Sequence, residues 1–236
     1  MSHRRSSRRA LLRALPSLLL LAGVRQADAL SLEDFTSKEA ATALRGALEQ
    51  GAHAAVQLLG RTDGFWGDER VRIPLPEWLD KAEATLRLFG RGRDVDELKL
   101  GINRAAEQAV PEARALLISA VRNISVQDAR GILAGGDDSV TQFFAGKTRA
   151  PLATRFLPIV TRATERIGLA RRYNRIATQA EGFGLVGPEQ ARIERFVTAK
   201  ALDGLYFMIG EEEKKIRRDP VGATQDIVRK VFGVLR

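Results

Sequence analysis

Three groups of polar residues in this chain have the types and spacings that a chemical site needs. Carboxylate oxygens bind hard cations such as Mg²⁺ and Ca²⁺, and a lysine beside them neutralises charge that develops on a bound group. Amide and guanidinium groups add directed hydrogen bonds. The candidate residues are Asn103, Arg104 and Glu107; Asp137, Asp138, Thr141 and Lys147; and Lys200, Asp203, Glu211 and Glu212.

The candidate metal ligands are Asp137, Asp138 and Glu211. Gly135 and Gly136 before the aspartates could form a tight backbone site for a cation, and an acidic triplet could supply oxygen ligands or a carboxyl group with a raised pKa. Both patterns also have a structural interpretation, because glycines end a helix, aspartates begin the next one, and acids pair with bases along a solvated helix. We favour the structural interpretation, and the sequence implies no cofactor.

Lys147 is left unexplained by that interpretation, because helical spacing places it between Val140 and Phe143 on an apolar face. Such a lysine either reaches water along its aliphatic stem or pairs with a buried carboxylate. Asp203 and Glu212, on a long helix near the C-terminus, are suitable partners. The hypothesis to test is that a carboxylate of that helix holds Lys147.

Asn103 and Glu107 share one side of another expected helix, as residues four apart do, and Arg104 lies beside them. They suit hydrogen bonds to a neighbouring helix or to a ligand, and the first use is the more common. Lys200 and Asp203 are three apart and can pair with each other.

The elements that must position these residues are helices. Apolar residues recur at helical spacing and long alternating β-branched runs are absent, so the fold class is all-α. Short connections favour a single multi-helix bundle of about eight to ten helices. The expected helices cover 37–60, 76–89, 94–109, a segment from 111, 125–134, 137–149, 151–167, 169–180, 188–218 and 220–235, with the longest connection at 61–76 and a glycine-rich one at 181–188.

Two of these helices carry clear local signals. Ser125 followed by Asp128 predicts a capping box at the start of a short helix. Six apolar residues on the helix from 94 form one stripe that should face the core. They are Val95, Leu98, Ile102, Ala105, Ala106 and Ala109.

Residues 1–29 have the features of a cleavable export signal: six arginines against one acid, an apolar stretch at 14–24, and Ala27-Asp28-Ala29 as a cleavage site. We predict cleavage after Ala29, which leaves 30–236 as a single helical domain. The segment 7–13 (SRRALLR) resembles the twin-arginine export signal, with Leu11 where that pattern prefers Phe, and an ordinary secretory signal is the alternative. The leucine run argues against an organellar transit peptide, and no cysteine follows for lipid attachment.

Composition excludes several kinds of chemistry. The chain has no cysteine and two histidines, His3 and His53, so disulfides, thiolate metal sites and a Ser-His-Asp triad have almost nothing to be made from. The formal net charge of +9 falls to +4 without residues 1–29, with acids interleaved among the bases, so we expect no nucleic-acid partner. No later segment approaches the ~18 apolar residues of a membrane span, and we expect a soluble periplasmic protein.

Four ordered motifs carry a family resemblance. They are 71–76 (VRIPLP), 103–107 (NRAAE), 135–138 (GGDD) with Thr141, Phe144, Lys147 and Thr148, and 200–214 from Lys-Ala-Leu-Asp to the acidic triplet. Together they resemble the bacterial exported family called domain of unknown function 4197, over about residues 32–232. Phe143 stands where that family often has Tyr, and Gly210 precedes the triplet. The resemblance implies an exported, helical, envelope-associated protein and brings no established activity, cofactor or catalytic residue.

The function we expect is that of a non-enzymatic envelope protein, exported through residues 1–29, that binds an unidentified partner or small ligand. Its cleft would lie between the helices carrying 137–147 and 200–213. One alternative is a cation-binding protein or acid-based enzyme that uses the paired aspartates and the acidic triplet. A second alternative is a weak binder of anionic envelope polymer or lipid.

Overall fold

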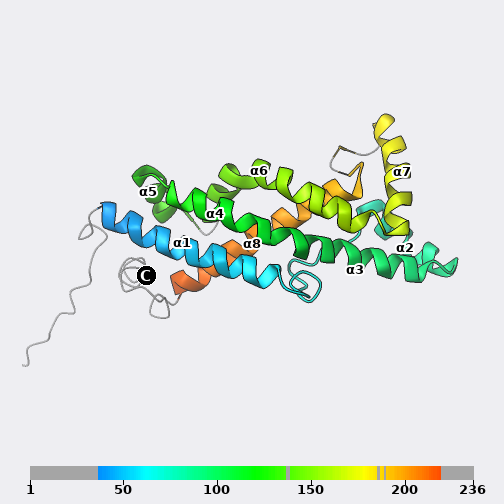
Figure 1. Cartoon of the computed structure of the whole chain (residues 1–236), viewed down its shortest axis with the longest axis horizontal. Coiled ribbons are helices and arrows are strands. Elements are labelled where there is room, and N and C mark those ends of the chain that lie inside the picture. Colours follow the sequence, from blue (N-terminus) through cyan, green and yellow to red (C-terminus); the bar gives the residue numbers. More distant parts are fainter. Residues whose placement is uncertain (1–36, 137–138, 185–186, 189, 219–236) are drawn as a thin grey trace, which may run out of the picture.

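The computed structural model describes residues 37–136, 139–184, 187, 188 and 190–218. All regular secondary structure in these residues is helical, so the all-α prediction is confirmed. The elements are α1 (Ser37–Leu59), α2 (Glu77–Leu88), α3 (Gly92–Ala109), the 3-10 helix η2 (Val110–Glu112), α4 (Ala113–Arg122), α5 (Val126–Ala134), α6 (Ser139–Thr164), α7 (Gly168–Gly182) and α8 (Ile193–Arg218). Helices α1, α3, α4, α6 and α8 run along the long axis, and α7 stands across one end (Figure 1).

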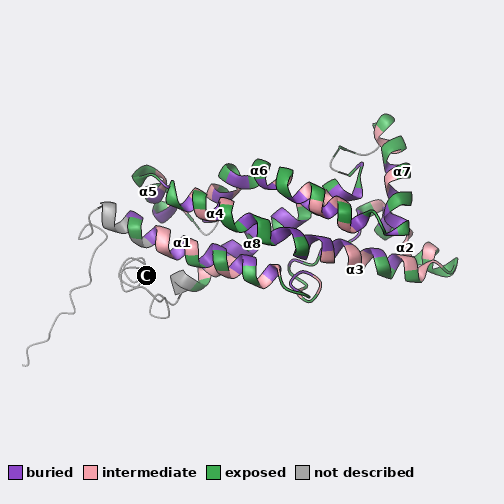
Figure 2. Cartoon of the chain, viewed as in Figure 1, coloured by how far each residue is buried: buried purple, intermediate pink, exposed green. Residues whose placement is uncertain are grey.

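Helix α8 is the centre of the bundle, and its most extensive contacts are with α6 and α1. Most residues from Ile193 to Ile209 are buried and apolar, as in a helix surrounded by others, and the exposed ones are Arg195, Lys200, Asp203 and Phe207. Val197, Ala201 and Leu205 have no exposed surface. Figure 2 shows buried residues on the inner sides of the long helices. Each large apolar side chain buried there contributes about 2 kcal/mol.

The two local signals in the sequence are confirmed. All six residues of the predicted stripe on α3 are buried. At the start of α5 the Ser125 hydroxyl accepts a hydrogen bond from the backbone N–H of Asp128, and the Asp128 carboxylate accepts one from the backbone N–H of Ser125. The hydrogen bonds also hold the pKa of Asp128 below its ordinary value.

The predicted break between 149 and 151 is wrong, because α6 continues through Pro151 and Pro158. A proline inside a helix costs about 3 kcal/mol through its missing N–H and the clash with the preceding turn. Both prolines are exposed, so water can bind the carbonyl groups that they leave free. On the other side α6 buries one residue in every four, and these large apolar side chains outweigh the cost. The buried row is Val140, Phe144, Thr148, Leu152, Phe156, Val160 and Thr164.

Other boundaries differ less. Helix α8 begins at Ile193 rather than at 188, since bends and turns occupy the residues before it. The predicted helix at 220–235, the export signal and its cleavage site lie outside the described residues. None of the helices in the described part of the chain combines the length and apolar character that crossing a bilayer requires.

Gly204 in the middle of α8 allows the connection at 61–76 to pack closely on this helix. A Cβ atom at position 204 would lie 2.7 Å from Cε1 of Phe65, a fully buried side chain of that connection. Neither a core ring nor a central helix can move aside freely. We expect Gly204→Ala to lower the free energy of unfolding by about 2 kcal/mol, measured by urea denaturation.

Gly146 in α6 is the matched control, because a Cβ there would meet nothing within 4 Å. In an exposed helix interior alanine is better than glycine by roughly 1 kcal/mol. Gly146→Ala should therefore leave stability unchanged or raise it. Equal effects of the two substitutions would show that close packing is not the reason for Gly204.

Candidate functional site

Asn103 is fully buried on α3 and binds the backbone of the extended segment before α2. Its Oδ1 accepts a hydrogen bond from the N–H of Ile73 at 2.8 Å, and its Nδ2 donates to the carbonyl of Ile73 at 3.0 Å. Nδ2 also donates to the carbonyl of Lys99 at 2.8 Å, one turn earlier on α3. The amide therefore pairs with both backbone groups of Ile73, as a neighbouring β-strand would.

Glu107, one turn further along α3, binds the other part of the same connection. Its Oε1 accepts hydrogen bonds from the N–H groups of Phe65 at 3.1 Å and Trp66 at 3.2 Å. Its Oε2 accepts one from Arg104 at 2.7 Å, and Arg104 also pairs with Asp63 at 2.7 Å. These partners raise the pKa of Arg104.

We call Asn103, Arg104 and Glu107 the loop clamp. The expectation that they bridge two helices is wrong, because their partners are the backbone and Asp63 of the connection at 61–76. A connection without strands or helices of its own has many backbone groups that need partners once they are buried. The clamp supplies these partners, so its polar atoms serve the fold.

A second group of candidates lies where α6 meets α8. The hydroxyl groups of Thr148 and Tyr206 are 2.9 Å apart in the core, and Thr141 donates to the carbonyl of Tyr206 at 3.4 Å. Nearer the surface, Arg149 pairs with Asp203 at 2.7 Å and lies over the Tyr206 ring. Lys200 lies 3.7 Å from the same carboxylate. These contacts close the α6–α8 interface where we expected a cleft.

Lys147 is exposed, so the hypothesis that a carboxylate of α8 holds it is wrong. Of the two expected partners, Asp203 is paired with Arg149, and Glu212 is paired with Lys215 at 2.6 Å. The reason is the geometry of the buried row on α6. Successive buried residues of α6 are four apart and are therefore rotated by about 40° around the helix axis. The buried face has already turned away from the side of Val140 and Phe143 by the position of Lys147, so Lys147 faces solvent.

The two tyrosines of the chain, Tyr173 and Tyr206, should titrate late. Burial raises the pKa of both above the ordinary value of 10.0, and Tyr173 also donates to the carbonyl of Gln190 at 2.6 Å. The folded state keeps these protons longer than the unfolded state, so their contribution to stability is complete below pH 10.0 and is lost as pH rises through the folded pKa values. In an alkaline titration followed by tyrosinate absorbance, the folded protein should titrate at higher pH than the protein in urea. Coincident curves while the helical circular dichroism persists would contradict this.

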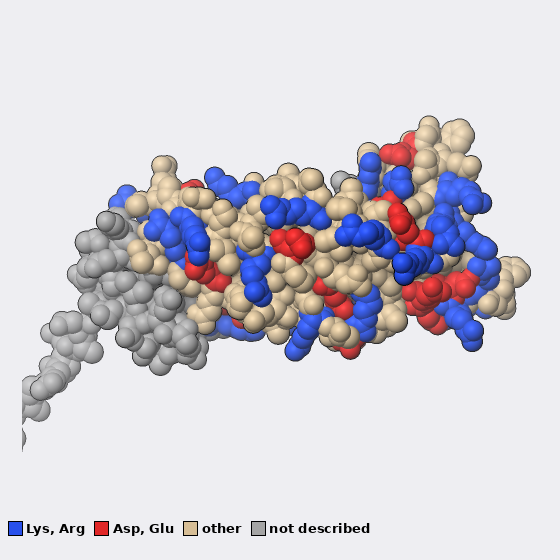
Figure 3. Space-filling model, viewed as in Figure 1, with Lys and Arg blue, Asp and Glu red and all other residues tan. Residues whose placement is uncertain are grey.

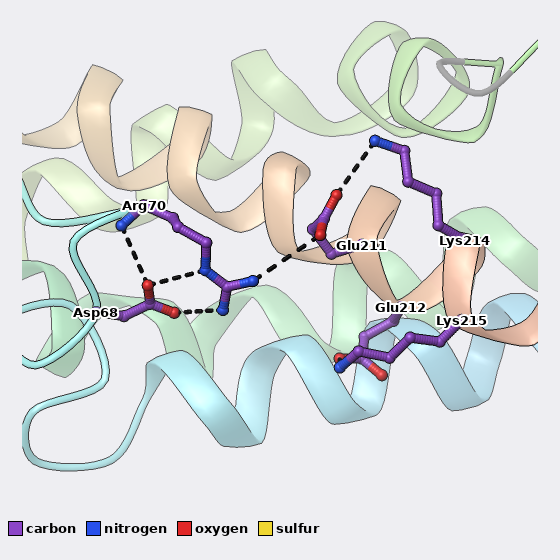
Figure 4. Close-up of polar contacts among 6 residues, drawn as sticks. All are labelled: Asp68, Arg70, Glu211, Glu212, Lys214 and Lys215. Atoms are coloured by element: carbon purple, nitrogen blue, oxygen red, sulfur yellow. Dashed lines mark hydrogen bonds and ion pairs between the residues drawn. The ribbon is translucent and has the colours of Figure 1, made fainter.

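Two residues of the acidic triplet, Glu211 and Glu212, lie in a set of charge pairs at the end of α8 (Figure 4). Arg70 binds Asp68 through two side-chain hydrogen bonds of 2.9 and 2.6 Å and reaches Glu211 at 3.8 Å. Glu211 also accepts from Lys214 at 3.1 Å. The hydrogen bonds lower the pKa of Asp68 and raise that of Arg70. These contacts tie the connection at 61–76 to α8.

Of the three candidate metal ligands, only Glu211 lies among the described residues. Glu211 has two basic neighbours, Arg70 and Lys214, which neutralise it. Asp137 and Asp138 lie outside the described residues. Within the part of the chain that the structure describes, no group of 3 or more His, Cys, Asp or Glu side chains could hold a metal ion.

A hollow of about 590 Å³ lies between the start of α3 and the start of α7, and we call it the α3–α7 hollow. Its charged and apolar lining residues are Arg91, Asp94, Glu97, Leu169, Arg171, Arg172, Arg175 and Ile176. Arg91 pairs with Asp94, and Arg171 donates to the carbonyl of Glu165. Among the described residues, no carboxylate pairs with Arg172 or Arg175. Figure 3 shows Lys and Arg gathered over this end of the molecule.

Sequence reasoning missed this hollow because its arginines come from helices far apart in the chain. The sequence nevertheless carries one sign of this hollow, a local excess of basic over acidic residues. The segment from Arg162 to Arg175 holds five arginines and one acid, Glu165. This local excess of +4 equals that of the whole of residues 30–236, where 32 bases face 28 acids. Such a segment marks a surface that attracts anions.

The chain belongs to the family described as protein of unknown function (DUF4197), which matches residues 34–233. No curated protein and no solved structure matches the chain.

Proposed function

We propose that this protein is an exported, non-enzymatic binding protein of the bacterial envelope, and that its α3–α7 hollow binds an anionic partner. The observation that supports this most is the pair Arg172 and Arg175, which line a concave surface without carboxylate partners among the described residues. Arginine binds phosphate and carboxylate groups through several N–H donors in one plane. A hollow lined by such groups suits an anionic ligand.

The roles of the other polar residues also support a binding protein. Asn103 and Glu107 form hydrogen bonds with backbone groups of the connection at 61–76. Asp203 and Glu211 are paired with basic side chains. A catalytic acid or base must reach the proton that it transfers. Groups committed to structural partners are poorly placed for that task.

Export is proposed from the sequence of residues 1–29. Mass spectrometry of the protein from a periplasmic extract should give a chain that begins at Leu30. Replacing Arg8 and Arg9 together by lysine separates the two routes, because the twin-arginine machinery requires the pair whereas the general secretory route needs only positive charge. Retention of the full-length chain in the cytoplasm with the unsubstituted signal would overturn the export proposal.

Anion binding is tested with polyphosphate as a soluble probe, over a range of salt concentrations. The triple variant Arg171→Gln, Arg172→Gln and Arg175→Gln should bind more weakly, and the slope of log affinity against log salt should fall by about two, as expected when ion contacts are lost. The control removes an equal charge elsewhere, at Arg114, Arg122 and Arg155 around a hollow of about 720 Å³ between α4 and α6. Equal losses in both variants would mean that net charge, not the α3–α7 hollow, decides binding.

The cation-binding or acid-enzyme alternative has less support, since Glu211 and Glu212 are paired with Lys214 and Lys215. It has a simple test. A ligand that prefers the folded state raises the melting temperature, so Mg²⁺ or Ca²⁺ at millimolar concentration would do so if this alternative holds.

A further inference from the structure

The turn between α2 and α3 exposes two large apolar side chains. Leu88 is 84% exposed and Phe89 is 75% exposed, at the end of α2. Gly90 follows with a φ of 74°, a left-handed conformation that glycine adopts without strain. Large apolar side chains at the tip of a helical hairpin gain nothing from the fold, so their exposure points to a surface that receives them.

The tip is held in place by contacts across the hairpin. Arg87 of α2 pairs with Asp96 of α3, and Lys99 of α3 pairs with Glu83 of α2 at 2.6 Å. Within the turn the N–H of Arg91 donates to the carbonyl of Leu86 at 2.8 Å. The apolar tip is therefore presented in one geometry, which lowers the entropic cost of binding.

The tip is continuous with the α3–α7 hollow. Arg91 lies two residues beyond Phe89 and lines the hollow together with Arg171, Arg172 and Arg175 of α7. Ile176, which is 53% exposed, lies on the same lining. In Figure 3 the α2–α3 turn is the uncharged tip at the right-hand end, and both Lys/Arg and Asp/Glu lie next to it, with Lys and Arg extending further over this end. Apolar and basic groups thus share one end of the molecule.

We infer that this end binds the surface of an anionic phospholipid bilayer. The arginines of the α3–α7 hollow would bind lipid phosphates, and Leu88 and Phe89 would enter the boundary between headgroups and acyl chains. This inference rests on the proposed function and names its partner. A soluble phosphorylated polymer offers charge without an apolar layer, whereas a bilayer surface offers both. The charge and the apolar tip together therefore favour a membrane.

The test measures co-sedimentation with vesicles of phosphatidylcholine alone and of phosphatidylcholine mixed with phosphatidylglycerol. The protein is used as isolated from its host, its N-terminus is determined by mass spectrometry, and all variants are compared in that form. We expect binding to the anionic vesicles and at least tenfold weaker binding to the neutral ones. Equal binding to both, or binding to neither, would overturn the inference.

The variants separate the two parts of the surface. The triple glutamine variant at Arg171, Arg172 and Arg175 should lose roughly a hundredfold in vesicle affinity. Each of the three arginines contributes separately to the attraction to an anionic surface, and the three contributions multiply in the binding constant. The double variant Leu88→Ser and Phe89→Ser should lose about tenfold or more on vesicles. It should bind polyphosphate as the unchanged protein does, because its arginines remain.

Matched controls use the other exposed groups of the chain. Phe183 is 82% exposed at the far end of α7, and Phe183→Ser should not change vesicle binding. The glutamine variant at Arg114, Arg122 and Arg155 should lose no more than about threefold, as expected of charges outside the contact. Arg122 pairs with Glu49 and Arg171 donates to the carbonyl of Glu165, so thermal melts of all the variants should confirm that they fold.

The outcomes also separate this inference from the proposed function. If polyphosphate binding depends on the α3–α7 hollow but the protein does not bind anionic vesicles, the partner is a soluble anion. The membrane inference is then wrong, while the proposed function stands. If neither probe binds, both are wrong. Vesicle binding that survives Leu88→Ser and Phe89→Ser unchanged would also overturn the role of the tip.

Discussion

Replacing Asn103 by leucine should lower the free energy of unfolding by about 4 kcal/mol, the sum of two buried backbone groups left without partners. Leucine has a similar volume but cannot hydrogen-bond, so the N–H and carbonyl of Ile73 would lose their partner. Ile73 is itself buried, and water cannot replace the amide without opening the structure. Urea denaturation of the purified protein measures the loss.

Asn123 provides a matched control for this substitution. It is exposed at the end of α4, and its amide donates only within its own helix, to Ser119. Asn123→Ala should change stability by less than about 1 kcal/mol. A loss below 1 kcal/mol for Asn103→Leu as well would mean that the extended segment is held by its apolar side chains alone.

The second large effect is expected for Glu107→Ala, a loss of about 3 kcal/mol. The N–H groups of Phe65 and Trp66 would lose their common acceptor, and Arg104 would keep only Asp63. Glu107→Gln retains an acceptor oxygen for the two N–H groups and should cost less than half as much. Urea denaturation measures both, and amide hydrogen exchange at residues 65 and 66 should accelerate in the alanine variant.

Glu69 is the control for that pair, because it is an exposed acid in the same connection. Glu69→Ala should stay within about 0.5 kcal/mol of the unchanged protein. If Glu107→Gln proves as destabilising as Glu107→Ala, the negative charge beside Arg104 is what matters, and the two backbone hydrogen bonds are secondary.

The helices that sequence predicted well are those in which one local pattern dominates. The stripe on α3 and the Ser125 capping box both concern neighbours within one turn, where spacing and chemistry suffice. The continuation of α6 through Pro151 could not be predicted, because the gain lies in side chains that pack against other helices. The prediction that a carboxylate holds Lys147 was wrong for a related reason, since the exposure of Lys147 depends on how the buried row of residues turns around α6.

The candidate sites show the same division. The sequence identified the loop clamp as out of place in a helix of this kind, yet it could not show that the partners are backbone groups some thirty to forty residues earlier. Backbone N–H and carbonyl groups leave no trace in residue types. The α3–α7 hollow was missed because Arg91 and Arg171 meet only when α3 and α7 pack together.

The loop clamp has a consequence for the order in which the protein assembles and opens. Asn103 and Glu107 lie on the same helix, so the connection at 61–76 has no complete set of partners until α3 has formed. That connection should therefore dock late in folding and detach first, as one cooperative unit with an opening free energy below that of the whole protein. Phe65 covers Gly204 of α8, so each detachment would briefly admit water to the central helix.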